Sequence, residues 1–208
     1  MIFIAGVIGC IDGTHVPIVK PSSRDYEEYR CRKSFFSINV QAVVDHDLKF
    51  SNIVVRWKGS THDSRIWNNC CLKAKFEAGL MNGYLLGDNG YACTNFVLTP
   101  LLNPVTPAEM RYNEAHIATR NTVERLFGIW KSRFQCLQKC LTFHPNKCCR
   151  VILATAVLHN FLRQHKHQDE SFAWAANESF FEPDDEREEV TEIMTNKREY
   201  VIQTFFSD

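Results

Sequence analysis

The stretch VIGCIDGTHVPIVK, residues 7–20, places a carboxylate directly after an apolar run. Gly13 follows Asp12, and a second apolar run resumes at Val16. The pattern predicts two strands, at 2–11 and 16–20, separated by a break at Asp12-Gly13-Thr14. An ionised carboxylate at the end of a buried strand is costly unless it is hydrogen-bonded, paired or bound to a metal. Asp12 therefore either caps the backbone of a turn at Gly13 or belongs to a charged site.

Length and composition favour one sizeable α/β domain with an appendage. The chain has 208 residues, of which 45% are hydrophobic, and no apolar run is long enough to predict a membrane span. The opening MIFIAGVIGCI has no basic leading segment, so a first core strand is favoured over a signal peptide. The odd count of nine cysteines predicts reduced thiols in an intracellular protein. A zinc site remains an alternative for four residues, although their spacing is looser than that of paired CxxC motifs: Cys136, Cys140, His144 and Cys148.

Charge divides the chain into a basic body and an acidic tail. Residues 1–165 hold 20 Lys and Arg against 12 Asp and Glu, whereas residues 166–208 hold 4 against 12. The basic body is compatible with a phosphate-bearing partner or with an ordinary solvated surface. In the tail we expect an acidic linker at 166–186 and an amphipathic helix at 187–208. The expected apolar face of that helix consists of Val190, Ile193, Met194, Lys197, Val201 and Phe205.

The early part of the chain predicts a hairpin followed by one helix. Two apolar strands, roughly 35–44 and 50–57, flank a turn signal at Asp45-His46-Asp47. The segment 64–80 has helical spacing of apolar residues and a stop at Gly79. Its candidate N-caps are Ser60, Thr61 and Asp63.

The later part predicts two short strands and two long helices, and the whole order implies a mixed sheet with helices packed on it. The strands are expected at 84–88 and 96–102. One helix begins after Thr106-Pro107, and a second spans about 145–164. The expected apolar side of the first helix consists of Ile117, Val123, Phe127, Trp130 and Phe134.

Three acids stand in apolar surroundings: Asp12 after VIGCI, Asp88 after YLLG and Glu124 in RNTVERLFG. Strand ends at one edge of an α/β sheet are where sites form. Carboxylates that converge there raise one another's pKa values unless a cation compensates, and oxygen ligands suit Mg²⁺ or Mn²⁺. Each acid also has a local alternative, because Asp88 could cap a turn and Glu124 could pair with Arg120 or Arg125.

The motifs around these acids resemble the DDE domain of Harbinger-type transposases, and especially the harbinger transposase-derived nucleases of animals. The resemblance extends from about Gly6 to Leu162, with the motifs in the family's order. It implies a ribonuclease-H-like α/β fold over residues 1–165, a mixed sheet flanked by helices. The motifs are GCIDGTHVPI, GSTHDSRIW, LLGDNGY, TPAEMRYNEAHIATRNTVERLFGIWKSRFQCL and LATAVLHNFL.

The resemblance implies a catalytic triad of Asp12, Asp88 and Glu124 that holds two divalent ions, Mg²⁺ or Mn²⁺. By analogy Asp12 touches both ions, and Asp88 and Glu124 each hold one. In such sites one ion activates the attacking oxygen and the other stabilises the leaving oxygen. The expected activity is cleavage of DNA phosphodiester bonds, in the nucleus or alternatively in the cytoplasm. Asp12 is then a metal ligand rather than a cap.

Residues near the triad have supporting roles in this interpretation. We expect His62 and Asp63 to support the ligands, with Asp63 capping the following helix and direct ligation by Asp63 as the lesser alternative. Residues 107–150 hold eight basic against three acidic side chains. Four of these basic residues are candidates for DNA-phosphate contacts, with a solvated helix surface as the alternative. They are Arg120, Arg125, Lys131 and Arg133.

The chain also departs from the family pattern. Family members carry a helical region before the first catalytic strand, whereas this chain starts close to that strand, which predicts a fragment or a truncated copy. The family works with a separate Myb-like DNA-binding partner, and no helix-turn-helix or zinc-finger motif is found here. One alternative is a catalytically silent domesticated domain that binds DNA or protein. Another is a phosphate-ester hydrolase, although its usual DxD motif is here Asp12-Gly13-Thr14. The DNA target and the oligomeric state stay open.

Overall fold

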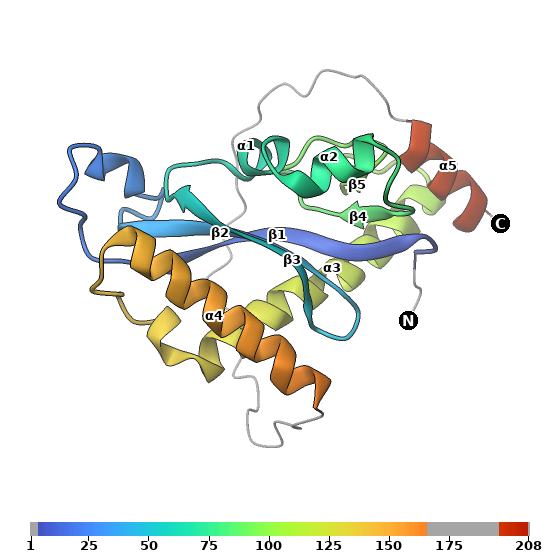
Figure 1. Cartoon of the computed structure of the whole chain (residues 1–208). Coiled ribbons are helices and arrows are strands. Elements are labelled where there is room, and N and C mark those ends of the chain that lie inside the picture. The colour runs from blue at the N-terminus through green and yellow to red at the C-terminus, as the bar shows by residue number, and fades with distance from the viewer. Residues whose placement is uncertain (1–3, 166–195, 208) are drawn as a thin grey trace.

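A computed structural model describes residues 4–165 and 196–207 (Figure 1). Five strands form one mixed sheet in the order β3-β2-β1-β4-β5. The central strand β1 pairs antiparallel with β2 on one side and parallel with β4 on the other. The strands are β1 (Val7–Pro17), β2 (Ser37–Val44), β3 (Phe50–Lys58), β4 (Tyr84–Leu86) and β5 (Val97–Leu98).

Helices cover both faces of this sheet, which confirms the predicted α/β class (Figure 1). Two short helices lie on one face and two long helices lie on the other, while α5 packs beside α3. Within the described ranges, no helix combines the length and the apolar character needed to cross a membrane. The helices are α1 (Asp63–Asn68), α2 (Cys71–Glu77), α3 (Pro107–Arg133), α4 (Pro145–Gln164) and α5 (Asn196–Phe205), with 3₁₀ turns η1 (Tyr26–Tyr29) and η2 (Gln135–Leu137).

The first strand is continuous, so the prediction of two strands at 2–11 and 16–20 was wrong. Asp12 pairs with Ala42 of β2, and Gly13 pairs with Gln41, so the chain does not turn at the glycine. A Cβ at Gly13 would lie 2.5 Å from Oδ1 of Asp63. Gly13 therefore permits a close approach by another side chain rather than a turn.

The single helix predicted for 64–80 is also wrong, because it is divided into α1 and α2 at Asn69 and Cys70. The N-cap of α1 is His62, whose side chain makes no capping hydrogen bond, and Asp63 is the first helical residue. Asp63 is therefore not the predicted cap. The second helix begins where Sγ of Cys70 accepts a hydrogen bond from the backbone N–H of Lys73.

The hairpin and the two long helices follow their sequence signals. In the β2–β3 turn, Oδ1 of Asp45 accepts hydrogen bonds from the backbone N–H groups of Asp47 and Lys49, each at 2.9 Å. Helix α3 starts with a capping box in which Thr106 and Glu109 satisfy each other's backbone N–H groups. The turn signal and the capping box thus predicted the hairpin and the start of α3 correctly.

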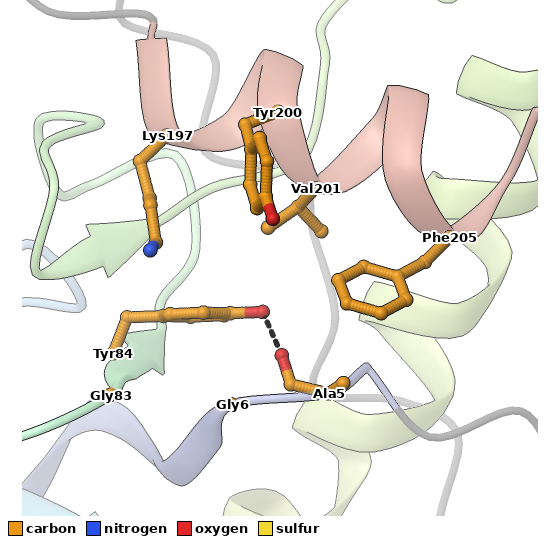
Figure 2. Close-up of a pocket in the computed structure, with 8 residues that line it drawn as sticks. All are labelled: Ala5, Gly6, Gly83, Tyr84, Lys197, Tyr200, Val201 and Phe205. Atoms are coloured by element: carbon orange, nitrogen blue, oxygen red, sulfur yellow. Dashed lines mark hydrogen bonds between the residues drawn. The ribbon is translucent and has the colours of Figure 1, made fainter.

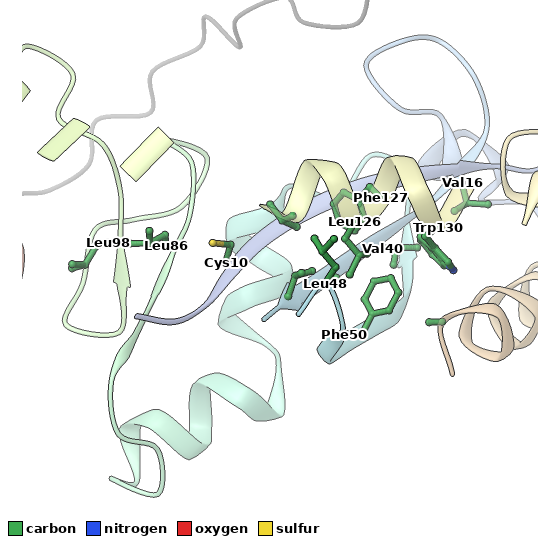
Figure 3. Packing of buried hydrophobic residues seen from close by; sticks show 14 of the residues in the cluster. Cys10, Val16, Val40, Leu48, Phe50, Leu86, Leu98, Leu126, Phe127 and Trp130 are labelled. Carbon is green, nitrogen blue, oxygen red and sulfur yellow. The ribbon is translucent and has the colours of Figure 1, made fainter. Parts of the chain in front are cut away.

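Alternation along the strands separates two hydrophobic clusters. Every second residue of β2, including Val40 and Ala42, packs toward α3 and α4, whereas Val43 packs toward α1 and α2. Figure 3 shows Trp130 and Phe127 of α3 against Val40 and Phe50. Ile117, expected on this apolar side, is 50% exposed, so that part of the prediction was wrong. Buried residues of α3 near this point are instead Tyr112, Ala115 and His116.

Helix α5 packs near the start of β1 and β4 (Figure 2). Val201 is buried as predicted, but Phe205 is 49% exposed, and Ile202 and Phe206 are buried in its place. Figure 2 shows Lys197 and Tyr200 lying over Tyr84 beside a cavity of about 210 Å³, which none of the three candidate acids lines. The predicted linker at 166–186 and the tail residues Val190, Ile193 and Met194 lie outside the described residues.

Buried histidines predict how stability depends on pH. Nε2 of the fully buried His159 donates to the carbonyl of Leu48 at 2.9 Å, and burial lowers the pKa of His159 to about 4. Since the folded pKa lies below the ordinary value, stability contributed by neutral His159 is present above about pH 6.5 and is lost as pH falls toward 4. The loss amounts to at most about 3 kcal/mol. We expect His159→Gln to reduce the slope of unfolding free energy against pH between 6.5 and 4.5, measured by urea denaturation.

The matched control for this measurement is His46→Gln, because the side chain of His46 is 84% exposed. The control should keep the wild-type slope. Identical slopes for wild type and His159→Gln would contradict the assignment of His159 as a buried neutral group.

Candidate active site

The parallel pairing of β1 with β4 places Asp12 and Asp88 at matching positions. Cys10 of β1 is in register with Leu86, the last residue of β4. Asp12 lies two residues after Cys10 within β1, and Asp88 lies two residues after Leu86, just beyond the end of β4. Adjacent strands lie about 4.8 Å apart. The two carboxylates therefore arise from neighbouring backbone positions, and the charge of Asp88 contributes to the raised pKa of Asp12.

Helix α3 brings Glu124 to Asp12 through a shared arginine. Arg120 and Glu124 are one helical turn apart, and α3 packs along β1. Nη1 of Arg120 donates to Oδ2 of Asp12 at 3.0 Å, and Nη2 of Arg120 pairs with Oε1 of Glu124. The side chains of Arg120, Asp12 and Glu124 are only 18%, 15% and 23% exposed. One guanidinium therefore links two of the three predicted acids in a site that is largely shielded from water.

Asp12 is the electrostatic centre of this site. The pKa of Asp12 is raised to about 8, chiefly by burial and also by the charges of Asp88 and Asp63. Arg120 and the N–H of Gly13, which donates to Oδ1 at 2.7 Å, oppose the rise. A carboxylate in this environment needs positive charge nearby to remain ionised at neutral pH.

The local alternatives considered for the acids are present and coexist with the site. Oδ1 of Asp12 accepts from the N–H of Gly13, and Oδ1 of Asp88 accepts from the N–H of Gly90 at 3.0 Å. Glu124 pairs with Arg120, as its alternative anticipated. Since a carboxylate has two oxygens and about four acceptor positions, one backbone hydrogen bond does not exclude a ligand role.

The donor set fits a hard divalent cation, although the acids are not gathered around a common point. Nowhere in residues 4–165 and 196–207 do three or more His, Cys, Asp or Glu side chains lie close enough to hold a metal ion. The acids do supply the carboxylate oxygens that Mg²⁺ and Mn²⁺ prefer. Burial and the charge of Asp88 raise the pKa of Asp12, so a cation beside it would favour the ionised form. Asp12, Asp88 and Glu124 are the residues that would hold such an ion.

The alternative zinc site is not assembled either. Cys148 is buried, and its thiol donates to the carbonyl of Phe143 at 3.2 Å, whereas Cys136 and Cys140 are exposed. His144 instead accepts a hydrogen bond from the backbone N–H of Asn146 at the start of α4. Although the backbone N–H of Cys148 donates to the carbonyl of His144, the described residues bring no three of these side chains together around a metal position.

Asp63 approaches β1 from the face opposite to Arg120. Its Oδ1 accepts from Nδ2 of Asn39 at 2.9 Å, and its carboxylate lies against the backbone of Gly13. The same amide of Asn39 also donates to the carbonyl of Thr61 at 2.8 Å. His62, the other predicted supporting residue, is exposed and lies 2.9 Å from Arg32. Asp63 therefore lies close enough for its charge to act on Asp12, whereas His62 lies on the surface.

The buried polar residues of β2 were missed from the sequence. Asn39 and Gln41 are only 3% and 2% exposed, and Gln41 accepts a hydrogen bond from Tyr91 at 3.4 Å. Their signal is visible afterwards as two amides at alternate positions in an otherwise apolar strand. Since amides on a strand usually indicate a solvated face, this signal was not distinctive.

The four candidate DNA-phosphate residues stand in different surroundings. Arg120 is bound to the acids, and Nζ of Lys131 donates to Oγ1 of Thr14 at 2.7 Å and to the carbonyl of His15 at 2.8 Å. Burial, and secondly the charge of Lys33, lower the pKa of Lys131 to about 8. Arg133 is partly buried and Arg125 is exposed. Arg125 is therefore the best placed of the four to meet a partner without rearrangement.

Comparison with known proteins defines the class. Residues 11–160 match the family model described as DDE superfamily endonuclease, and this span contains all three acids. The mixed sheet with helices on both faces is the ribonuclease-H-like fold expected for that superfamily. No solved structure gives a significant match.

Individual relatives narrow the class. The chain is 39% identical over 166 residues to "Putative nuclease HARBI1" of Bos taurus, which covers 78% of this chain and 47% of that protein. The human protein of the same name is 38% identical over 164 residues, covering 77% and 47%. "Protein ALP1-like" of Arabidopsis thaliana is 26% identical over 174 residues, covering 74% and 42%. The chain belongs to the Harbinger transposase-derived family of DDE superfamily endonucleases. It spans about half the length of the curated relatives it matches.

Close contact between Gly13 and Asp63 predicts a specific coupling. A Cβ at residue 13 would lie 2.5 and 2.6 Å from the two carboxylate oxygens of Asp63, so Gly13→Ala should cost about 1–3 kcal/mol of stability. In Gly13→Ala/Asp63→Ala the clash is removed. The double variant should therefore be no less stable than Asp63→Ala alone, as measured by urea unfolding in a double-mutant cycle. Simple additivity of the two single effects would contradict the contact.

Proposed function

We propose that this chain is the catalytic domain of a DNA endonuclease that depends on divalent metal ions and cleaves phosphodiester bonds. The observation that carries the proposal is that Arg120 joins Asp12 of β1 to Glu124 of α3. The pairing of β1 with β4 also brings Asp88 close enough for its charge to act on Asp12. Membership of the DDE superfamily adds the reaction class, because these endonucleases generally use divalent metals. The proposed ions are Mg²⁺ or Mn²⁺, two per site.

In this proposal the protein contributes ligands, orientation and charge. Asp12, Asp88 and Glu124 would hold the ions, which would supply activation of the attacking oxygen and stabilisation of the leaving oxygen. The sheet fixes Asp12 and Asp88 relative to each other, and α3 fixes Glu124. Asp63 adds negative charge from the far side of Gly13, which increases the demand of Asp12 for a cation. The negative charge of these acids would thus favour binding of metal ions at the place where a DNA strand is cleaved.

A second candidate function is a catalytically silent domain that binds DNA or protein. The observation that favours it is the pairing of Arg120 with both Asp12 and Glu124, in which a side chain of the protein itself partly compensates the charge of the two acids. The phosphate-ester hydrolase is not proposed, because the family match is to endonucleases.

We also propose a nuclear location and a separate DNA-binding partner of the Myb type. Both rest on the family resemblance and on the substrate, since DNA is found in the nucleus.

Replacing Asp88 tests the main proposal. We expect Asp88→Asn to lower Mn²⁺-dependent nicking of supercoiled plasmid by at least about 100-fold, because the amide is a poorer ligand and carries no charge. The measurement is the initial rate of conversion to open-circular DNA, with the fold of each protein verified by circular dichroism.

The matched control is Asp47→Asn, which alters an exposed acid in the β2–β3 turn and should nick at the wild-type rate. Equal nicking by wild type and Asp88→Asn would indicate a contaminating nuclease and reject the proposed triad. Absence of nicking by a folded wild-type protein that still binds DNA would favour the silent domain.

Arg125 provides a test of the DNA contact. Because Arg125 is exposed, Arg125→Gln should leave the unfolding free energy within about 0.5 kcal/mol of wild type. Loss of one phosphate contact should weaken binding to DNA of any sequence and reduce the salt slope of log K by about 1. Fluorescence anisotropy with two unrelated DNA duplexes, at several salt concentrations, measures the affinity and its salt slope. An unchanged salt slope would remove Arg125 from the interface.

A further inference from the structure

Arg120 contacts two of the three acids at once, and this arrangement has a consequence for metal binding. Nη1 is hydrogen-bonded to Oδ2 of Asp12, and Nη2 is paired with Oε1 of Glu124. Both acids lie in a partly buried environment in which the carboxylate charges are poorly screened by water. The guanidinium therefore serves here as the cation that these acids require.

The oxygens that Arg120 uses are donors that a metal ion would also use. A carboxylate oxygen engaged by a guanidinium is less available to a divalent ion, and two positive charges close to the same acids repel each other. Binding of an ion to Asp12 and Glu124 must therefore weaken or replace at least part of the Arg120 contacts. Pairing with Arg120 and binding of a metal ion therefore compete for the same carboxylate oxygens.

We propose that Arg120 is an internal counter-ion that holds Asp12 and Glu124 in position and is exchanged for divalent metal, so that it sets the metal affinity of the site. This inference rests on the proposed function and deepens it. Arg120 is accordingly a positioning residue, which acts on the reaction through the acids. Its long flexible stem allows the guanidinium to move away from the acids while α3 stays in place.

The energetic basis is the cost of bringing like charges together. With Arg120 removed, Asp12 and Glu124 lose a shared cation while Asp88 and Asp63 still act on Asp12, so the folded protein should become less stable. A divalent ion could then bind Asp12 and Glu124 without displacing a guanidinium. The inference consequently predicts opposite effects of one substitution on stability and on metal affinity.

The test uses Ca²⁺ binding, which does not depend on cleavage. We expect Arg120→Gln to bind Ca²⁺ about 10-fold more tightly than wild type by isothermal titration calorimetry, equivalent to about 1.4 kcal/mol. Without Ca²⁺, the melting temperature of Arg120→Gln should be lower than that of wild type. Saturating Ca²⁺ should raise the melting temperature of Arg120→Gln by more than it raises that of wild type. Arg125→Gln, which removes the exposed arginine one residue after Glu124, should match wild type in both measurements.

Arg120→Lys guards against a folding failure of the glutamine variant. Lysine keeps the charge but cannot contact two carboxylates with one planar group, so its Ca²⁺ affinity should lie between those of wild type and Arg120→Gln. Unchanged or weaker Ca²⁺ binding in the folded Arg120 variants would overturn the counter-ion role and assign Arg120 to orienting the ligands.

The two proposals fail in distinguishable ways. If wild type binds Ca²⁺ and Asp88→Asn binds it more weakly, the metal site stands whatever the Arg120 variants do. If neither wild type nor Arg120→Gln binds Ca²⁺, the metal-dependent function is rejected, and the exchange of Arg120 is rejected with it.

Discussion

The position of β1 at the centre of the sheet is the constraint on which the rest of the structure depends. Because β1 pairs antiparallel with β2 and parallel with β4, its register with both neighbours is fixed. Strand alternation then sends Cys10 and Asp12 toward α3, and Ile11 and Gly13 toward α1. A shift of the register by one residue would exchange these faces and bury the acid in the wrong cluster. The backbone pairing of this strand thus decides which helix can supply a partner to Asp12.

That geometry creates an electrostatic demand which the sheet alone cannot meet. Asp12 is largely buried and lies near two further acids, Asp88 and Asp63, which approach from a neighbouring strand and from the opposite face. The hydrogen bond from Gly13 and the charge of Arg120 both lower the pKa of Asp12, but they do not offset burial and the neighbouring acids, since the pKa still rises to about 8. Positive charge must come from α3 or from a bound ion. The stability of this region and its proposed chemistry are therefore linked through the same carboxylate.

The sequence predicts an element of the fold correctly where the element depends on neighbouring residues, and less well where it depends on tertiary contacts. The capping box at Thr106 and the turn at Asp45 depend only on residues close in sequence, and both elements were predicted correctly. The continuity of β1 and the division of α1 from α2 depend on tertiary partners: Gly13 looked like a turn because Asp63, fifty residues later, is invisible in a local pattern. The three acids were proposed as a site because Asp12 and Asp88 follow apolar strands, Glu124 lies on the long helix and the motifs resemble the family. The shared contacts of Arg120 were anticipated only as a surface pair with Glu124, since spacing shows the helical neighbour but not the strand across from it.

A site that already contains its own cation solves a folding problem that acid-rich sites share. Ion ligands of like charge repel one another while the chain folds, and an uncompensated buried carboxylate opposes the packing of the elements that carry it. Arg120 comes from the same helix as Glu124 and reaches the same strand as Asp12, so packing α3 against β1 forms both ion pairs in one step. The packing of Cys10 under Thr119, whose carbonyl accepts from the thiol at 3.4 Å, holds this helix to the strand beside the acids. In such an arrangement the fold does not depend on an ion arriving first, and the strength of the internal pairing limits how tightly an ion can bind afterwards.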